Sequence, residues 1–297
     1  MPRISASFRR APRLALATLC LVLAAPAAAA DLDRGRYLVE ALTACDNCHT
    51  PRGPDGYLRD KRFSGGSQTF NGANYSVRGP NISPDAATGV GAWSDDRLTA
   101  AIVAGVGPDG RLAPAMPSEY YRILTARDLE AIVAFLRAAA PVEAARPIQR
   151  RDGEQAAETF PGAETPFEEK DLADPLRRGF YVATLARCME CHSGETNGAL
   201  DHKEKLGAGG KLFRTPAGAA VGANITQHER AGIGAWSDDE IKAAITKGVG
   251  RDGRPLKPTM ANLSKAHFSK MAAQDLDALV LWLRAIPPRA GLPKTTD

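Results

Sequence analysis

The chain has 297 residues, of which 24% are charged and 44% hydrophobic, and its formal net charge is +4. This length allows one large or two ordinary domains, and the normal apolar content excludes a disordered polymer. No long apolar run follows residue 30, which excludes a multi-span membrane protein, whereas the mild basicity leaves a nucleic-acid partner open.

Residues 1–30 are predicted to be a secretory signal peptide. Four arginines precede an apolar run at 14–25, and the small residues Ala28 to Ala30 suit signal peptidase. We expect cleavage after Ala30 and a periplasmic mature chain without a membrane span. The alternative is that the segment is retained as an uncleaved anchor, although its apolar run is short for spanning a bilayer. The rest of the chain carries 34 basic and 34 acidic residues, so no nucleic-acid partner is expected.

A tandem repeat covers most of the remaining chain. The motif Cys45-Asp-Asn-Cys48-His49 recurs 143 residues later as Cys188-Met-Glu-Cys191-His192. The same offset relates Asn81-Ile-Ser to Asn224-Ile-Thr, and Trp93 to Trp236 within a Trp-Ser-Asp-Asp motif. Self-similarity at a fixed offset indicates two homologous domains.

The repeat sets the expected domain boundaries. We expect a first domain at 31–141, a linker at 142–174, a second domain at 175–290 and a tail at 291–297. The linker is rich in Pro, Glu and Ala and has little apolar periodicity, so it is expected to run along the surface of both domains.

The same three helices are predicted in each domain. The first, at about 33–44 and 175–187, leads into the cysteine motif. The second follows Ser94 and Ser237, which are expected N-caps, with Glu240 completing a capping box in the second copy. The last, at about 126–139 and 273–285, has apolar residues at helical spacing, and no strand alternation is evident.

About 45 residues rich in Gly and Pro separate the first and second helices. A loop of that length argues against a compact domain unless it wraps a large apolar cofactor that supplies the missing core. The two Cys-x-x-Cys-His motifs specify such a cofactor, because two thiols at this spacing can bond the vinyl groups of haem while the histidine ligates the iron. A thioredoxin-like disulfide or a shared zinc site would not explain the repeated histidine.

The axial ligands follow from these assignments. Cys45, Cys48, Cys188 and Cys191 are expected to attach two c-type haems, with His49 and His192 as the first iron ligands. Apart from the motif cysteines, Met116 is the only soft ligand available in 31–141, and Met260 is its counterpart 144 residues later. Met271 and His267 are weaker candidates in the second copy because neither has a counterpart in the first.

Other repeated residues are candidates for the haem environment. Trp93 and Trp236 are expected to pack beside the haem edge, mainly as core. Arg111 and Arg254 follow Asp-Gly turns, where they either pair with haem propionates or remain solvated.

Each half resembles a class I cytochrome c domain, with an N-terminal helix, the haem motif, a long Gly/Pro-rich loop, a distal Met and a C-terminal amphipathic helix. The finer pattern resembles the cytochrome c subunits of bacterial periplasmic alcohol and gluconate dehydrogenases. The resemblance implies an all-α fold of two tandem domains, each with covalent haem and haem-wrapping loops. It also implies that a proline soon after the motif accepts a hydrogen bond from the histidine ring N–H through its carbonyl, a role that Pro51 can fill in the first domain and that the second domain must meet differently. Those subunits usually carry three haems and a membrane-anchoring segment, whereas this chain has two haem motifs.

We therefore expect a dihaem electron carrier without catalytic activity of its own. It would take electrons from a periplasmic dehydrogenase and pass them to a cytochrome or terminal oxidase of the respiratory chain. With His/Met ligation at both irons, no position is open to a substrate. The alternative is a dihaem cytochrome c peroxidase-like enzyme, which needs one displaceable axial ligand.

Overall fold

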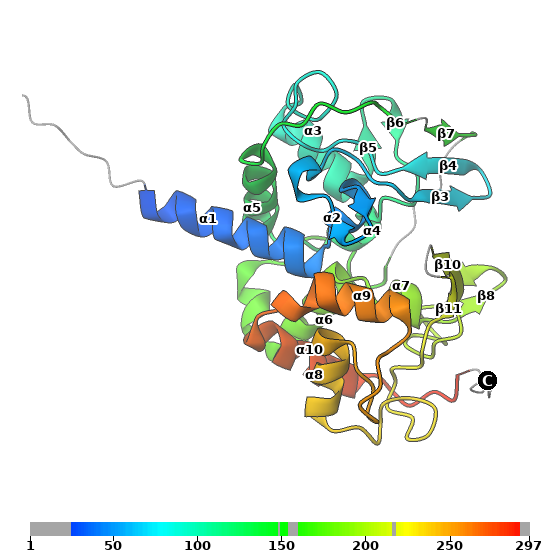
Figure 1. Cartoon of the computed structure of the whole chain (residues 1–297). Helices are drawn as coiled ribbons and strands as arrows, with labels where there is room; N and C mark the ends of the chain where they lie inside the picture. The colour runs from blue at the N-terminus through cyan, green and yellow to red at the C-terminus, as the bar shows by residue number, and fades with distance from the viewer. Residues whose placement is uncertain (1–24, 148, 154–159, 216–217, 292–297) are drawn as a thin grey trace, which may run out of the picture.

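The computed structural model describes residues 25–147, 149–153, 160–215 and 218–291. Most of the predicted signal peptide (1–24) and all but the first residue of the predicted tail (292–297) lie outside the described residues. The described chain folds into two halves stacked on each other, one formed by residues up to 153 and the other by residues from 160 onward (Figure 1).

The first half begins and ends with a helix. Its elements in chain order are α1 (Ala25–Tyr37), η1 (Leu38–Leu42), α2 (Asp46–His49), β1 (Arg52–Gly53), β2 (Gly56–Tyr57), η2 (Arg59–Lys61), β3 (Thr69–Gly72), β4 (Tyr75–Arg78), α3 (Asp95–Thr99), η3 (Ala100–Ala104), β5 (Val106–Gly107), β6 (Gly110–Arg111), α4 (Ser118–Tyr121) and α5 (Ala126–Arg137).

The second half follows nearly the same order. After β7 (Arg150–Arg151) and η4 (Glu169–Ala173) in the connection come α6 (Pro175–Leu185), α7 (Cys188–His192), β8 (Glu195–Thr196), β9 (Ala199–Leu200), β10 (Leu212–Thr215), β11 (Gly218–Val221), α8 (Asp238–Lys247), α9 (Pro258–Ala266), η5 (Phe268–Lys270) and α10 (Ala273–Ala285).

The predicted helix starts are confirmed. The Ser94 hydroxyl accepts a hydrogen bond from the backbone N–H of Arg97 and caps α3. Ser237 and Glu240 form the predicted capping box at the start of α8, each side chain accepting from the other's backbone N–H. These caps satisfy backbone N–H groups that have no partner within the helix.

The all-α prediction is wrong. Helix accounts for 41% of the described residues and strand for 11%, and these strands form several small sheets, so the fold is mixed α and β. The Gly-rich loop supplies the antiparallel hairpins β1–β2 and β3–β4, and the second half has β8–β9 and β10–β11. Strands of two to four residues that pair across tight turns are too short to leave an alternating pattern in the sequence.

Each half is built on a close crossing of its first and last helices, α1 on α5 and α6 on α10. Gly35 and Gly179 lie at the two crossings. A Cβ atom at either glycine would overlap the backbone carbonyl oxygen of the facing helix, at Ala131 and Ala278 respectively. Glycine is therefore required at both crossings for the two backbones to approach.

A reciprocal pair of buried polar clusters joins the halves. Asp128 on α5 accepts two hydrogen bonds from the Arg34 guanidinium, at 2.7 and 2.6 Å, and one at 2.6 Å from the Tyr181 hydroxyl of the other half. Asp275 on α10 accepts from Arg178 at 2.8 Å and from the Tyr37 hydroxyl of the first half at 2.6 Å. In each half, a tyrosine thus donates a hydrogen bond to a buried carboxylate of the other half.

Burial and the facing carboxylate raise the pKa of both tyrosines, Tyr37 and Tyr181, well above the ordinary value. The phenols consequently remain donors at every physiological pH. The carboxylates gain fixed partners, which compensates for taking them out of water.

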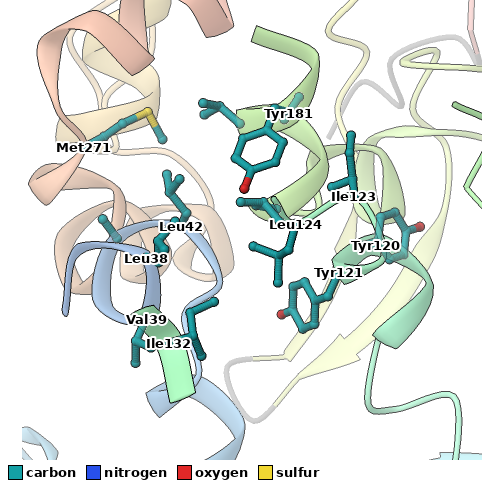
Figure 2. Packing of buried hydrophobic residues seen from close by; sticks show 14 of the residues in the cluster. Leu38, Val39, Leu42, Tyr120, Tyr121, Ile123, Leu124, Ile132, Tyr181 and Met271 are labelled. Atoms are coloured by element: carbon teal, nitrogen blue, oxygen red, sulfur yellow. The ribbon is translucent and has the colours of Figure 1, made fainter. Parts of the chain in front are cut away.

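One hydrophobic cluster extends through both halves. Figure 2 shows Tyr181 and Met271 of the second half on the same cluster as Leu38, Leu42 and Leu124 of the first. His267 is also buried between the halves, with its two ring nitrogens 2.8 Å from the Glu40 carbonyl oxygen and 2.7 Å from the Tyr57 hydroxyl. Met271 and His267, the weaker ligand candidates, therefore lie in the contact between the halves.

The connection between the halves is integrated into the fold. Its start binds the first half, where the Val142 carbonyl accepts from the Asn81 side chain and β7 pairs with β4. Farther along, Phe160 and Ala163 are buried in the shared hydrophobic cluster. The segment thus contributes both a strand and core residues, in addition to joining the halves.

We expect Asp128→Asn to destabilise the holoprotein by about 3 kcal/mol, because it removes a buried carboxylate on which Arg34 and Tyr181 converge. Urea unfolding at pH 7 measures the change. Asp95→Asn is the matched control, since the Asp95 side chain is 70% exposed in its ion pair with Arg137 and its loss should cost less than about 1 kcal/mol. Equal losses in the two variants would contradict the cluster's role.

Candidate functional site

Both Cys-x-x-Cys-His motifs occupy equivalent helical turns, α2 and α7. The residue before each motif, Ala44 and Arg187, adopts a left-handed backbone conformation with φ of 50° and 55°. Non-glycine residues adopt this conformation rarely. Its presence at both positions fixes how the chain enters the two turns.

The two motif histidines are held in the same way. The Nδ1 atom of His49 lies 2.8 Å from the carbonyl oxygen of Pro80, and Nδ1 of His192 lies 2.8 Å from that of Ala223. A carbonyl can only accept, so Nδ1 carries the hydrogen and Nε2 keeps its lone pair. Burial lowers the pKa of both imidazoles and favours this neutral form. Each ring is therefore prepared to be a ligand through Nε2.

This arrangement corrects one expectation from the sequence. The acceptor for His49 is the carbonyl of Pro80 and not that of Pro51, and the second half has the same support. The missed signal was the repeat itself, because Pro80 and Ala223 directly precede the repeated Asn-Ile-Ser and Asn-Ile-Thr triplets. Their side chains gave no hint, since the backbone makes the contact.

A glycine precedes each of these carbonyl-bearing residues. A Cβ atom on Gly79 would overlap the carbonyl oxygen of Cys48, and one on Gly222 would overlap that of Cys191. The loop therefore passes directly against the motif's backbone in both halves. This close approach is what brings the acceptor carbonyl to the imidazole.

A cavity of about 640 Å³ opens beside the first motif. Five of the predicted site residues line it together: Cys45, Cys48, His49, Trp93 and Met116. Most of its remaining wall is apolar, including Val77, Pro80, Ile82, Val90, Leu98, Ile102, Leu112, Leu124, Ile132 and Leu136. Large apolar pockets with a few convergent polar groups are typical of cofactor sites.

The two methionines occupy different local structures. Met116 precedes α4 in a turn closed by the hydrogen bond from its N–H to the Ala113 carbonyl at 2.9 Å. Met260 lies in the first turn of α9, two residues after Pro258. Met260 and Trp236 are partly buried against the hydrophobic cluster, as Met116 and Trp93 are.

The two repeated arginines differ from the arginines at the cavity. Arg111 does not line the cavity, and its guanidinium donates to the Ala104 carbonyl at 3.3 Å. The Arg254 side chain is 84% exposed and pairs with Asp252. The cavity instead has arginines that the repeat could not reveal: Arg78, Arg97, Arg146, Arg151 and Arg187. Arg146 and Arg151 come from the connection, and Arg187 comes from the second half.

The four thiols are free and partly buried. Burial raises the pKa of Cys45 to about 11 and that of Cys188 to about 12. A thioredoxin-like redox pair needs a lowered thiol pKa, which is the opposite. The described residues also contain no group of three or more His, Cys, Asp or Glu able to hold a metal ion, so a shared zinc site has no ligand set there.

The donor set therefore fits a covalently attached haem. Two thiols, a neutral imidazole and a thioether sulfur border one apolar cavity in the first half. These are the groups that define a c-type cytochrome. Within the described residues, no helix is long and apolar enough to cross a membrane.

Comparison with known proteins finds similar chains among cytochrome c subunits of dehydrogenases. The chain is 28% identical to the fructose dehydrogenase cytochrome subunit of Gluconobacter japonicus over 89% of its length. It is 28% identical over 92% to the gluconate 2-dehydrogenase cytochrome c subunit of Pantoea cypripedii, and 28% identical over 82% to a diheme cytochrome c-type protein of Cereibacter sphaeroides. The resemblance to cytochrome c subunits of dehydrogenases is thus confirmed.

The matches differ in how much of each relative they include. The chain spans 54% of the fructose dehydrogenase subunit and 64% of the gluconate dehydrogenase subunit, but 82% of the diheme protein. No family model matches the chain.

We expect Gly79→Ala and Gly222→Ala each to destabilise the protein by about 2 kcal/mol, because the added methyl group meets a backbone carbonyl that cannot move independently. Thermal and urea unfolding measure the loss. Gly53→Ala is the control, since its methyl group would meet only the flexible end of the Leu58 side chain. If all three variants unfold alike, the close approach at the motif does not constrain the site.

Proposed function

We propose that the protein is a dihaem electron carrier that accepts electrons from a dehydrogenase. The observation that carries the proposal is the cavity on which Cys45, Cys48, His49 and Met116 converge. The named relatives support the dehydrogenase, since two of them are cytochrome subunits of fructose and gluconate dehydrogenases. The count of two haems rests on the second motif and on the diheme relative.

The residues have defined tasks in this proposal. Cys45 and Cys48 hold one haem by thioether bonds, and Cys188 and Cys191 hold the other. His49 and His192 ligate iron through Nε2 while their Nδ1–H groups stay bonded to backbone carbonyls. Met116 and Met260 supply the sixth ligands. Bound in this way, haem supplies a one-electron couple.

The apolar wall contributes by excluding water. Leu98, Ile102 and Leu136 line the cavity, and all three belong to the hydrophobic cluster. A dry site with fixed ligands changes little between oxidation states, which suits rapid electron transfer. Trp93 lies at the same wall, where it would pack beside the edge of a bound haem.

We further propose that the chain works in the periplasm. The expected cleavage after Ala30 lies within α1, whose first turns project away from the two halves (Figure 1). The contacts to α5 are made by residues on the mature side of that bond, such as Arg34 and Gly35. Removing residues 1–30 therefore leaves the helix crossing in place. The electron acceptor is a cytochrome or terminal oxidase of the respiratory chain.

The peroxidase-like alternative requires a sixth ligand that leaves easily. Met116 is fixed on both sides by backbone hydrogen bonds, its N–H to Ala113 and its carbonyl to the N–H of Ser118 at 2.8 Å. A ligand held in this way supports a closed iron site and a carrier role.

We expect the reduced wild-type protein to bind no carbon monoxide. Met116→Ala and Met260→Ala should each bind one equivalent, because each substitution removes the proposed methionine ligand of one iron. Absorption spectroscopy during CO titration gives the stoichiometry. In a separate spectrum, the methionine–iron charge-transfer band of each variant should have half the intensity of the wild-type band. Met271→Leu, at a buried contact between the halves, is the matched control and should behave as wild type. Stoichiometric CO binding by the wild type would favour the peroxidase-like alternative.

A further inference from the structure

Arg187 belongs to one half by sequence and to the other half's cavity by position. It immediately precedes Cys188 and caps the start of α7. Its side chain is only 18% exposed and lines the first half's cavity together with Cys45, Cys48 and His49. A charged group on the second motif therefore faces the cofactor site of the first.

The charge of Arg187 is only partly compensated. Its Nη1 atom donates to the Glu190 carboxylate at 2.9 Å, and the Glu190 side chain is 35% exposed, twice the exposure of the arginine. Water screens the carboxylate better than the guanidinium. The buried neighbour Tyr121 is neutral, because burial raises the pKa of the phenol. The cavity thus experiences a net positive charge from this pair.

Most of the other charged residues at the cavity are more exposed than Arg187. Arg78, Arg97, Arg146 and Asp109 line it as exposed side chains, and Arg151 is partly buried. Solvent weakens the field of exposed groups at the cavity's interior. The charge of Arg187, whose side chain is 18% exposed, therefore acts through less solvent than the charges of those four exposed residues.

The charge is present on one motif only. The residue equivalent to Arg187 in the first half is Ala44, and the residue equivalent to Glu190 is Asn47. Both Ala44 and Arg187 have the same left-handed backbone, so local geometry does not require an arginine. The asymmetry therefore distinguishes two otherwise similar sites by their electrostatics.

We propose that Arg187 raises the reduction potential of the first half's haem from its position on the second motif, making it a potential-setting residue shared by the two sites. The inference rests on the proposed function. Reduction adds one negative charge to the site, and a fixed cation in an apolar cavity stabilises that form. Arginine stays protonated throughout, so no proton accompanies this effect.

Spectroelectrochemical titration of the holoprotein tests the proposal. We expect Arg187→Gln to lower the equilibrium constant for reducing the first half's haem about tenfold, which is about 59 mV for a one-electron couple. Arg187→Lys should retain most of the potential, and Glu190→Gln should shift it in the opposite direction. Met260→His assigns the couples, since bis-His ligation lowers the potential of the second half's haem.

The control is Arg177→Gln, which removes the same charge from a half-exposed side chain that does not line the cavity. A potential for Arg187→Gln equal to that of this control would overturn the proposal. So would equal shifts in the Gln and Lys variants, because that result would indicate a packing role. Haem content is measured first, in the wild type and in each variant. If none of these proteins carries covalent haem, the proposed function is refuted. If they carry two haems and the potentials do not change, only the role of Arg187 is refuted.

Discussion

One hydrogen bond, from the ring nitrogen of the motif histidine to a backbone carbonyl, organises each half of this protein. It joins His49 to Pro80 and His192 to Ala223, and the geometry is the same in both halves. The bond is possible only because Gly79 and Gly222 let the loop pass against the cysteine motif. The long loop, which the sequence predicted to wrap a cofactor, thus also fixes an imidazole that exposes Nε2 as a ligand.

The two halves share this device but are not equivalent. Tyr37 and Tyr181 are exchanged between the halves with near symmetry, as expected for two copies of one domain packed on each other. Arg187 breaks that symmetry by placing a charge of the second motif at the first cavity. If the two sites of an electron carrier were identical, an electron would occupy either site equally. A small electrostatic difference between the sites makes one of them the preferred site.

The sequence predicted the main helices and the five residues that line the first half's cavity together: Cys45, Cys48, His49, Trp93 and Met116. The caps at Ser94 and Ser237 and the convergence of His49 and Met116 follow from local patterns and from the repeat. The all-α class was wrong because the hairpins are too short to show periodicity. Contacts made by backbone carbonyls and by residues far apart in the chain, such as His267 with Tyr57, depend on tertiary packing and have no local signature.

Each Cys-x-x-Cys-His motif is proposed to carry a covalently attached haem. Intact-mass spectrometry of the purified mature protein under denaturing conditions shows whether it does. We expect a mass increase of two haems, and a loss of one haem when both cysteines of either motif, Cys45 and Cys48 or Cys188 and Cys191, are replaced by serine. A chain that carries no covalent haem, or whose haem survives both replacements, would refute this proposal.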